Sequence, residues 1–454
     1  MEHYKSIYFV GAGGIGMSAL ERYCLAKGMK VAGYDKTPSH LTDQLQSEGI
    51  ELFFDEDEDS IPSYCKNPEN TLVIYTPAIP ENHKGLEYFR NNGFKVIKRS
   101  ELLGLITSSS KGLCFAGTHG KTTTSSMAAH IFHQSAIGCN AFLGGILKNY
   151  DSNLILSETS PFSIIEADEY DRSFHRLHPY MAVITATDPD HFDIYGNEEA
   201  YLESFSHFTS LIQPGGCLIM KKGIKAIPRV QEGVKIYQYS ANKGGDFHAE
   251  HIRIGNGQII FDFIAPGDSI PDIELGVPVE INIENAVASI AIAWLNGIPA
   301  QDIRKAMASF KGAKRRFDFW VKEKNIVMID DYAHHPTELR ATLNTAKEMG
   351  YKRLIAVHQP FTYSRTKMLF NDFVDVLKIP DITVLTPIMG SREPNDPTIT
   401  SAKLAAQIPG SVLVNSLEEA AEWVKQNARE GDLVITLGCG DIYKASKMMV
   451  ADNQ

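Results

Sequence analysis

Short apolar runs that end in glycine or charged residues recur along the chain and predict parallel β-strands. The first run, Ser6–Val10, ends at a glycine cluster, and a helix from Met17 to Lys27 follows it, with Gly28 as its stop. Lys30–Tyr34 then forms a second apolar run. The order strand, helix, strand is a β-α-β unit, which is typical of an α/β fold with a parallel sheet.

The alternation continues to the end of the chain and predicts three α/β domains, at residues 1–106, 107–312 and 313–454. In the first domain, further strands are expected at Thr71–Tyr75 and Lys95–Ile97. In the central domain, strands are expected at Gly112–Ala116, Phe162–Glu166 and Met181–Thr187, and helices at Thr122–Gln134 and Asn282–Leu295. In the third domain, strands are expected at Ile326–Ile329, Leu354–Val357, Ile382–Leu385 and Leu433–Leu437, and a helix at Thr337–Met349.

The composition is that of a soluble globular protein and limits its partners. The 454 residues are 43% hydrophobic and 22% charged, with a formal net charge of −11. This excludes disorder as the main state and argues against a nucleic-acid binder, which usually has a basic face. We find no cleavable signal pattern and no run long enough to span a membrane, so we expect a cytoplasmic protein, monomeric or homodimeric. The six cysteines are scattered, which favours buried thiols over a metal or redox site.

A glycine-rich loop follows the first strand and matches the pattern GxGxxG. Its residues are Gly11, Ala12, Gly13, Gly14, Ile15 and Gly16. Such a loop allows the backbone to approach a diphosphate at a helix N-terminus. Asp35, about twenty residues after the loop, and Thr76, which follows the expected strand Thr71–Tyr75, are further candidates for this site. The motif does not distinguish NAD from another nucleotide diphosphate, and glycines that only pack a helix on a strand remain the alternative.

A second loop, between an expected strand and an expected helix, is a shortened P-loop. Its residues are Gly117, Thr118, His119, Gly120, Lys121, Thr122 and Thr123. Phe115 stands where the longer pattern has its first glycine. In a P-loop the backbone N–H groups cradle phosphates, the lysine reaches the β- and γ-phosphates, and the hydroxyl ligates Mg²⁺. The loop predicts an ATP site, and two phosphate loops in one chain favour a ligase or kinase.

Acidic and histidine residues cluster where later strands end. Glu166-Ala167-Asp168-Glu169 offers carboxylates for Mg²⁺, and we choose Glu166 because it comes first as the apolar run ends. Asp188–Asp193 contains His191 among acids, either as a second metal site or as a structural turn. Asp330–Pro336 holds two adjacent histidines that face either a ligand or the cap of the next helix.

Together these motifs resemble those of the Mur ligase family. The resembling stretches keep the family's order and are Gly11–Met17, Gly117–Thr124, Glu166–Asp171, Asp190–Asp193, Arg315–Asp318, Asp330–Glu338 and Tyr363–Thr366. The resemblance implies a three-domain α/β architecture, with a Rossmann-like domain for the UDP part, a central P-loop ATPase and a C-terminal Rossmann-like domain for the amino acid.

The resemblance also implies a reaction. It is strongest to those members that use ATP and Mg²⁺ to join L-alanine to the lactyl carboxylate of UDP-N-acetylmuramate in peptidoglycan synthesis. ATP would phosphorylate the carboxylate to an acyl phosphate, the amine of L-alanine would attack it, and phosphate would leave.

The resemblance assigns roles to individual residues. Gly11 to Gly16 would hold the UDP diphosphate, and Lys121 would stabilise the transferred phosphoryl group. Thr122 and Glu166 would hold one Mg²⁺, and Glu166 with His191 a second. The residues implied to contact ATP from elsewhere are Asn282, Asn285, Arg316 and Asp331. The residues implied to line the reacting centre are His334 and Arg365.

The chain departs from the family pattern at five positions. Ile281 stands where many members have His, Ala186 where Asn is usual, and Phe361-Thr362 where His-Arg is common. Cys439 stands where a small residue is usual. Three other functions stay open: a recycling ligase that joins the same nucleotide to a preformed peptide, an NAD-dependent oxidoreductase that uses Gly11–Gly16 and Asp35, and a non-catalytic nucleotide-binding regulator.

Overall fold

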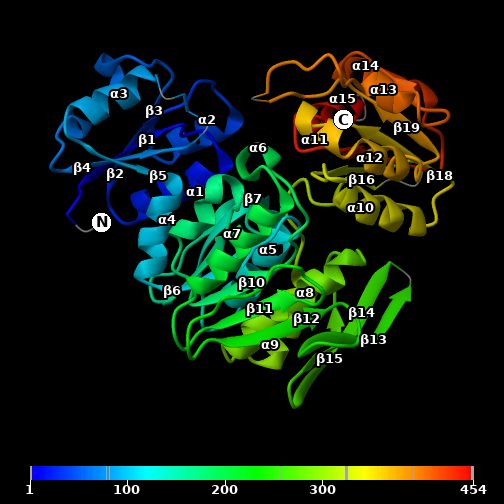
Figure 1. Cartoon of the computed structure of the whole chain (residues 1–454), viewed down its shortest axis with the longest axis horizontal. Helices are drawn as coiled ribbons and strands as arrows, with labels where there is room; N and C mark the ends of the chain where they lie inside the picture. The colour runs from blue at the N-terminus through cyan, green and yellow to red at the C-terminus, as the bar shows by residue number, and fades with distance from the viewer. Residues whose placement is uncertain are drawn as a thin grey trace. The chain divides into compact units, whose positions relative to one another are not determined.

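The protein is described by a computed structural model in which the chain forms two compact units (Figure 1). The described residues are 3–77, 79–80, 82–255, 257–322, 326–391 and 393–450, without the side chains of residues 192, 193 and 322. One unit comprises Met1–Pro278 and Asn282–Lys311, and the other Val279–Ile281 and Gly312–Gln454. The first unit holds two β-sheets and the second holds one. The domain boundaries expected at residues 106 and 312 stay predictions.

The amino-terminal sheet is parallel and has the order β3-β2-β1-β4-β5. Its strands are β1 (Ser6–Val10), β2 (Lys30–Tyr34), β3 (Glu51–Phe53), β4 (Thr71–Tyr75) and β5 (Lys95–Lys98). Its helices are α1 (Ile15–Ala26), α2 (His40–Ser47), η1 (Glu58–Ser60), η2 (Ser63–Cys65), α3 (Lys84–Asn91) and α4 (Arg99–Ser108). The expected strands and first helix of this part are confirmed, with ends that shift by one or two residues.

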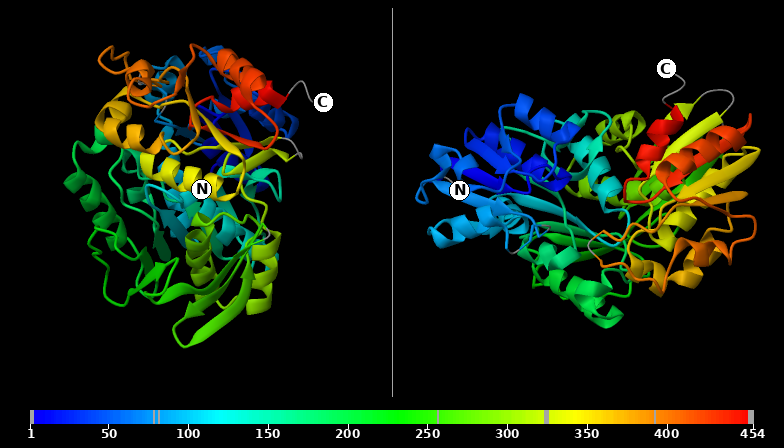
Figure 2. Two further views of the ribbon diagram at one scale, coloured as in Figure 1. Left: turned by 90° about the vertical axis from the view of Figure 1, so that its right-hand side faces the viewer. Right: turned by 90° about the horizontal axis from the view of Figure 1, so that it is seen from above.

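Both faces of this sheet are covered, which explains why its strands are apolar without alternation (Figure 2). In β1, Ile7 and Phe9 pack into a cluster that includes α1, whereas Tyr8 and Val10 pack into another that includes Phe89 of α3. Successive side chains of a strand point to opposite faces, so a strand buried on both sides needs apolar residues throughout.

The central sheet has ten strands in the order β15-β14-β13-β12-β11-β10-β6-β9-β7-β8. Its strands are β6 (Lys111–Ala116), β7 (Asn140–Leu147), β8 (Ser152–Ile155), β9 (Phe162–Glu166), β10 (Met181–Ile184), β11 (Cys217–Lys221), β12 (Lys235–Ser240), β13 (Phe247–Gly255), β14 (Gln258–Ala265) and β15 (Asp268–Glu274). Its helices are α5 (Lys121–Gln134), η3 (Tyr170–Arg176), α6 (Phe192–Tyr195), α7 (Glu198–Ser210), α8 (Ile281–Leu295) and α9 (Ala300–Ser309). The strands from β7 to β13 pair in parallel around β6, and antiparallel pairs occur only toward the two edges.

One expected strand of this sheet is shorter than the sequence predicts. The strand expected at Met181–Thr187 ends at Ile184. The next residues are engaged by the P-loop instead, because the Thr185 hydroxyl donates to the carbonyls of Ala116 and His119, and the carbonyl of Ala186 accepts from the Thr118 amide. Strand β10 thus covers only Met181–Ile184, the residues that pair with β6 on one side and β11 on the other.

The sheet of the second unit has the order β16-β17-β21-β18-β19-β20, parallel except for the pair β16–β17. Its strands are β16 (Asp318–Lys322), β17 (Ile326–Asp331), β18 (Arg353–His358), β19 (Ile382–Leu385), β20 (Val412–Leu413) and β21 (Asp432–Leu437). Its helices are α10 (Pro336–Glu348), α11 (Tyr363–Met368), α12 (Phe370–Val376), α13 (Ser401–Ala405), α14 (Leu417–Asn427) and α15 (Tyr443–Val450). The four strands and the helix expected here are confirmed.

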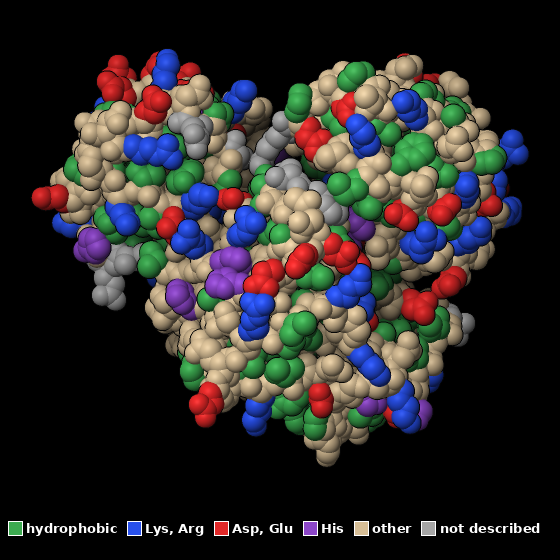
Figure 3. Space-filling model, in the orientation of Figure 1, with side chains coloured by type: hydrophobic (Ala, Val, Ile, Leu, Met, Phe, Trp, Pro, Cys, Tyr) green, Lys and Arg blue, Asp and Glu red, His purple; other side chains and the backbone are tan. Residues whose placement is uncertain are grey.

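The surface agrees with the composition. On the face drawn in Figure 3, acidic and basic side chains are interspersed, with no extended basic area among the described residues of that face. In the described part of the chain, no helix is both long and apolar enough to cross a bilayer. The six cysteines are free thiols, and five of them are buried.

A glycine holds α4 close to η3, and its replacement tests that packing. A Cβ at Gly104 would meet the backbone carbonyl oxygen of Arg176, which cannot rotate away. We expect Gly104→Ala to lower the stability of the first unit by about 1–3 kcal/mol, because the added methyl group forces the two elements apart. Gly255→Ala is the control, since no heavy atom lies within 4 Å of its Cβ position. Urea unfolding checks the expectation, and equal midpoints for the two variants would contradict it.

Candidate active site

The first glycine loop lies at the carboxyl end of β1 and is held by its neighbours. Gly11 has a φ of 91°, and a Cβ there would lie 2.5 Å from Cγ2 of Thr76. The amide of Gly13 donates to Oδ2 of Asp35 at 2.7 Å. Helix α1 starts at Ile15 without a side-chain cap from any described residue. Its first amides therefore point to a position that suits an anion, as the sequence predicts.

Arg99 connects this loop to the acidic end of β9. A Cβ at Gly16 would meet the Arg99 guanidinium, and Nη2 of Arg99 lies 3.4 Å from Oδ2 of Asp168. A cavity of about 130 Å³ lies between the two elements, and its lining includes Ile15, Gly16, Arg99, Glu166 and Asp168. The predicted diphosphate loop and the predicted Mg²⁺ carboxylate thus face one cavity within the first unit.

The P-loop is held tightly by the segment that follows β10. Gly117 has a φ of 137°, and a Cβ there would lie 2.7 Å from the amide nitrogen of Ala186. The Thr118 hydroxyl donates to the carbonyl of Asp188 at 2.7 Å, and Nε2 of His119 lies 3.1 Å from Oδ2 of the same aspartate. Gly120, with a φ of 81°, precedes α5. Only glycine fits the first of these turns without strain.

Lys121 is paired with Glu169, a residue that we did not choose from the sequence. Its ammonium donates to Oε2 and Oε1 of Glu169 at 2.7 and 2.9 Å and to the carbonyl of Gly117 at 2.5 Å. Burial opposes the charge of Lys121, but the carboxylates of Glu169, Asp168 and Glu166 outweigh it and raise the pKa of the lysine. Lys121 is therefore charged at neutral pH.

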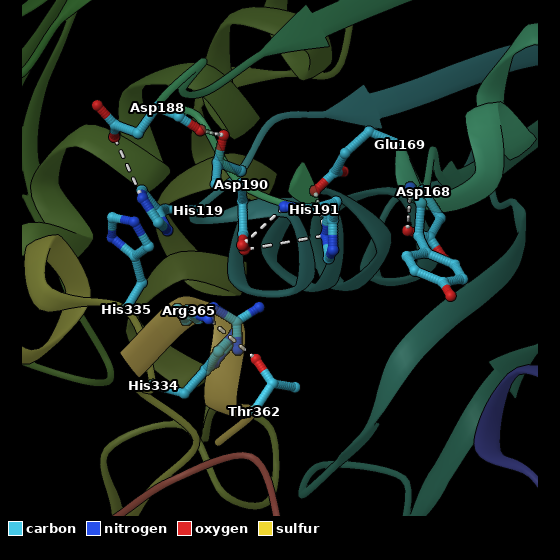
Figure 4. Close-up of polar contacts among 12 residues, drawn as sticks. His119, Asp168, Glu169, Asp188, Asp190, His191, His334, His335, Thr362 and Arg365 are labelled. Carbon is cyan, nitrogen blue, oxygen red and sulfur yellow. Dashed lines mark hydrogen bonds and ion pairs between the residues drawn. The ribbon is translucent and has the colours of Figure 1, made fainter. Parts of the chain in front are cut away.

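Glu169 also faces His191, as Figure 4 shows. Glu169 is 1% exposed, and its Oε1 lies 3.5 Å from Nε2 of His191. Burial opposes ionisation of Glu169, yet Lys121 and His191 lower its pKa to about 2. Burial likewise opposes the charge of His191, but Glu169 and Asp190 raise its pKa. Glu169 is thus buried between Lys121 and His191, and each contact favours the charged form of the groups involved.

Thr122 and Glu166 place hard oxygen atoms side by side, as the Mg²⁺ prediction requires. The Thr122 hydroxyl lies 3.1 Å from Oε1 of Glu166, and Oε2 of Glu166 accepts from the amide of Gly144 at 3.1 Å. Mg²⁺ prefers oxygen and needs few protein ligands beside phosphates, so this pair fits the metal. The described residues contain no group of three or more His, Cys, Asp and Glu that could hold a metal by itself.

The predicted second metal pair is not brought together in the same way. His191 is directed at Glu169 and, at 3.9 Å, at Asp190, whereas the contacts of Glu166 run to Thr122 and Gly144. His191 has a φ of 53°, a strained conformation for a residue with a side chain. The side chain of Asp193 lies outside the described residues. The pairing of His191 with Glu166 on one ion stays a prediction.

The asparagines of α8 lie against the P-loop helix. Oδ1 of Asn285 accepts from the Thr124 hydroxyl at 3.1 Å, and its amide donates to Asn282 at 3.2 Å. Asn282 in turn donates to the carbonyl of Val277. Both asparagines are buried, and Thr123 lies half-buried in the first turn of α5. Helix α8 therefore fixes the start of α5, next to the phosphate loop.

In the second unit, Asp331 ends β17 and organises the turn after it. Its carboxylate accepts from the amides of Phe317 at 2.6 Å and Ala333 at 2.7 Å. Arg316 lies over the ring of Tyr332, 4.7 Å from its centroid. The neighbouring Arg315 donates instead to Asp330 and to backbone carbonyls, so it is the structural member of the arginine pair.

The histidines after β17 have different roles. The side chain of His335 caps α10 by accepting from the amide of Thr337, which is the helix-cap alternative that the sequence left open. Nδ1 of His334 lies 3.1 Å from the carbonyl of Tyr332 and 3.3 Å from Oε2 of Glu338.

Arg365 lies in the first turn of α11 and is 9% exposed. Its guanidinium donates to the carbonyl of Phe361 at 3.2 Å, and its amide donates to the Thr362 hydroxyl at 3.4 Å. Thr362 has a φ of 65° and caps α11. The departure at Phe361-Thr362 is therefore part of the turn that holds Arg365.

Comparison with known proteins identifies relatives along the whole chain. Three family models match: "Mur ligase family, catalytic domain" at residues 6–111, "Mur ligase middle domain" at 115–293 and "Mur ligase, glutamate ligase domain" at 315–440. The UDP-N-acetylmuramate–L-alanine ligase of Parabacteroides distasonis is 55% identical over 96% of this chain and 95% of its own length.

Solved structures show the same architecture. A UDP-N-acetylmuramate-alanine ligase from Thermotoga maritima has a TM-score of 0.82 and 25% identity, over 99% of both chains. A murein peptide ligase from Psychrobacter arcticus has a TM-score of 0.72 and 22% identity, over 98% of both chains, a likeness of fold. The predicted three-domain α/β architecture is confirmed.

Two buried aspartates of the second unit are expected to titrate in opposite directions. Burial raises the pKa of Asp331 to about 6, although Arg316 and two amides oppose the shift. Burial acts on Asp432 as well, but Arg353 and the Arg429 amide lower its pKa. Carboxyl-carbon NMR should show Asp331 titrating near pH 6 and Asp432 below its usual range.

The sign of the stability effect follows from this shift. Because the folded pKa of Asp331 exceeds its ordinary 3.8, the folded chain binds the proton more tightly. Asp331 therefore favours folding below about pH 4 and loses this contribution as the pH rises to about 6. Asp331→Asn should remove that part of the pH dependence of unfolding. An Asp331 titration at its ordinary value would contradict the expectation.

Proposed function

The chain belongs to the Mur ligase family, and on that premise we propose that it joins L-alanine to the lactyl carboxylate of UDP-N-acetylmuramate with hydrolysis of ATP to ADP and phosphate. The observation that carries the proposal is the cavity at which the diphosphate loop of α1 and the carboxylate of Glu166, partner of the P-loop Thr122, come together. The 55% identity to an alanine-adding ligase supports the choice of substrates.

The reaction needs an anionic acceptor beside an anionic phosphoryl donor. A carboxylate oxygen attacks the γ-phosphorus of ATP, ADP leaves, and an acyl phosphate forms. The amine of L-alanine then attacks the carbonyl carbon, and the tetrahedral intermediate expels phosphate to form the amide. The ammonium of Lys121 and the amides of the P-loop would stabilise the charge that develops on the transferred phosphoryl group.

Mg²⁺ is proposed as the metal, with Thr122 and Glu166 as the residues that would hold it. When bound, Mg²⁺ supplies positive charge that neutralises phosphate oxygens. In the second unit, the assignments of Arg316 and Asp331 to ATP, and of His334 and Arg365 to the reacting centre, stay proposals that rest on the family resemblance. A cytoplasmic location and a monomeric or homodimeric state also stay predictions.

An acceptor panel tests the proposed substrates. With ATP, Mg²⁺ and UDP-N-acetylmuramate, we expect L-alanine to give the amide and phosphate in equal amounts, with products identified by mass. A preformed peptide as acceptor tests the recycling ligase, and NADH binding tests the oxidoreductase. Amide formed with the peptide and not with L-alanine would replace the proposal by the recycling activity.

Replacement of the P-loop lysine tests its role in catalysis. We expect Lys121→Ala to lower kcat by about 10²- to 10³-fold, because a preorganised positive charge at the phosphoryl group is lost. Lys111→Ala is the matched control, since Lys111 lies exposed at the other end of β6, over the rings of Phe162 and Tyr180. Steady-state phosphate release checks both variants. Activity left intact in Lys121→Ala would contradict the P-loop role.

A further inference from the structure

A buried asparagine joins the central sheet to the helix that follows the diphosphate loop. Asn153 lies in β8, at the edge of the sheet, and is 1% exposed. Its Nδ2 donates to the carbonyl of Ile15 at 2.6 Å and to Oγ of Ser18 at 3.2 Å, and its Oδ1 accepts from Nη1 of Arg22 at 3.1 Å. A carbonyl only accepts and a guanidinium only donates, so these contacts fix the orientation of the amide. The three partners are spaced by three and four residues and therefore lie on one face of α1.

Apolar side chains also join α1 to the central sheet. The helix packs against β7 and β8, and Figure 1 shows it beside β7. The rings of Tyr23 and Phe142 meet edge to face, with centroids 5.1 Å apart, and Leu20 belongs to the same apolar cluster as Leu154. Apolar contacts are not directional, so they constrain the position of the helix along the strands less sharply than hydrogen bonds do. The hydrogen bonds of Asn153 therefore set this position.

The two ends of this connection both reach the cavity between the diphosphate loop and the acidic end of β9. The lining of that cavity includes Ile15 and Gly16 from the first turn of α1, and Gly144 and Glu166 from the central sheet. Asn153 lies on β8, which pairs with β7, and the Gly144 amide of β7 donates to Oε2 of Glu166 at 3.1 Å. A short series of contacts thus runs from the start of α1 through Asn153 and β7 to Glu166.

The separation between these parts decides whether the proposed substrates can react. The nucleotide substrate would be held by its diphosphate at the loop before α1, whereas its lactyl carboxylate must reach the γ-phosphorus of ATP at the P-loop of the central sheet. Because the substrate has a limited reach, a shift of the first loop relative to the central sheet moves the carboxylate away from the phosphorus. A misplacement of about 1 Å can lower the rate of such a reaction about 10²-fold.

We propose that Asn153 is a positioning residue that fixes the start of α1 relative to the central sheet and thereby sets the distance from the diphosphate loop to the P-loop. This inference rests on the proposed function, because it takes a nucleotide-linked carboxylate as the ligand of the first loop and ATP as the ligand of the second. Asn153 is 1% exposed, so it acts through Ile15 and not by contact with a reactant. Its loss leaves the amides of both loops in place and changes only where the first loop lies.

The experiment compares Asn153→Leu with the parent chain. Leucine is similar in size but has no amide, so the hydrogen bonds to α1 are lost while the position stays filled. We expect kcat to fall about 10- to 100-fold and the KM values for UDP-N-acetylmuramate and ATP to change by less than about threefold, because each loop keeps its own amides. Calorimetric titration with each nucleotide should still give one site per chain, so that the lower kcat does not come from an inactive fraction.

Asn149→Leu is the matched control, because Asn149 lies in the turn between β7 and β8 but is directed at other partners. Its Nδ2 donates to the carbonyl of Ser309 at 2.9 Å, and its Oδ1 accepts from the amide of Lys311 at 2.8 Å. The substitution removes hydrogen bonds of the same kind from the same hairpin without affecting α1. We therefore expect its kcat to stay within about twofold of the parent value.

A second variant carries the test if Asn153→Leu does not fold. The Ser18 hydroxyl accepts from Asn153 and donates to the carbonyl of Ile15 at 2.9 Å, so Ser18→Ala weakens the same connection with the loss of one oxygen atom. We expect Ser18→Ala to lower kcat about threefold or more, with both KM values unchanged.

Three outcomes overturn the positioning role. The first is a kcat of folded Asn153→Leu, or of Ser18→Ala, that equals the kcat of Asn149→Leu. The second is a higher KM for UDP-N-acetylmuramate with an unchanged kcat, which would limit Asn153 to substrate binding. The third is a number of sites per chain that falls in proportion to kcat, which would limit it to folding. If the parent chain forms no amide from L-alanine and UDP-N-acetylmuramate, the proposed function fails, and this inference fails with it.

Discussion

The positions of several side chains around the P-loop depend on the ammonium group of Lys121, whose side chain is only 13% exposed. A charge in this position is tolerated only with counter-charges and hydrogen bonds around it, and Glu169 and the carbonyl of Gly117 supply them. Glu169 in turn requires Tyr195 at its carbonyl and His191 at its carboxylate. The left-handed residues after β9 and β10 lie in the segments that carry these groups, so the strain there serves one electrostatic arrangement.

The same arrangement would allow a chain with a net charge of −11 to bind anions. The phosphate sites that we propose do not depend on a basic surface, and acidic and basic side chains are interspersed on the face shown in Figure 3. They depend on loop amides and on single cations such as Lys121 and Arg99, which lie beside carboxylates. A cation beside carboxylates stays charged and ordered. Phosphate oxygens can take the place of the carboxylate oxygens, because both are anionic hydrogen-bond acceptors.

The sequence predicts local features well and pairings poorly. Strands and phosphate loops follow from apolar runs, glycines and neighbouring residues, so β1, β6 and the start of α5 lie where the pattern places them. Glu166 and Glu169 lie three positions apart after one strand, and only their side-chain directions show which of them meets Lys121. Likewise, Asp35 is a candidate for contact with the nucleotide in the sequence, yet its carboxylate accepts from the amide of Gly13. Which partner a side chain contacts depends on segments that are distant in the chain, and the spacing of residues in the sequence does not predict it.

Glu166 and Glu169 differ in what they can bind because their surroundings differ. Glu166 lines a cavity, accepts from an amide and a hydroxyl, and keeps its oxygens beside the end of the glycine loop. Such a carboxylate suits a hydrated divalent ion, which needs space for water. Glu169 is 1% exposed and lies between Lys121 and His191, so it has no room for a hydrated ion and can act only on its neighbours. One acidic turn thus provides one carboxylate for the Mg²⁺ that we propose and another that pairs with the lysine, because burial separates the chemistry of residues that the sequence presents as equivalent.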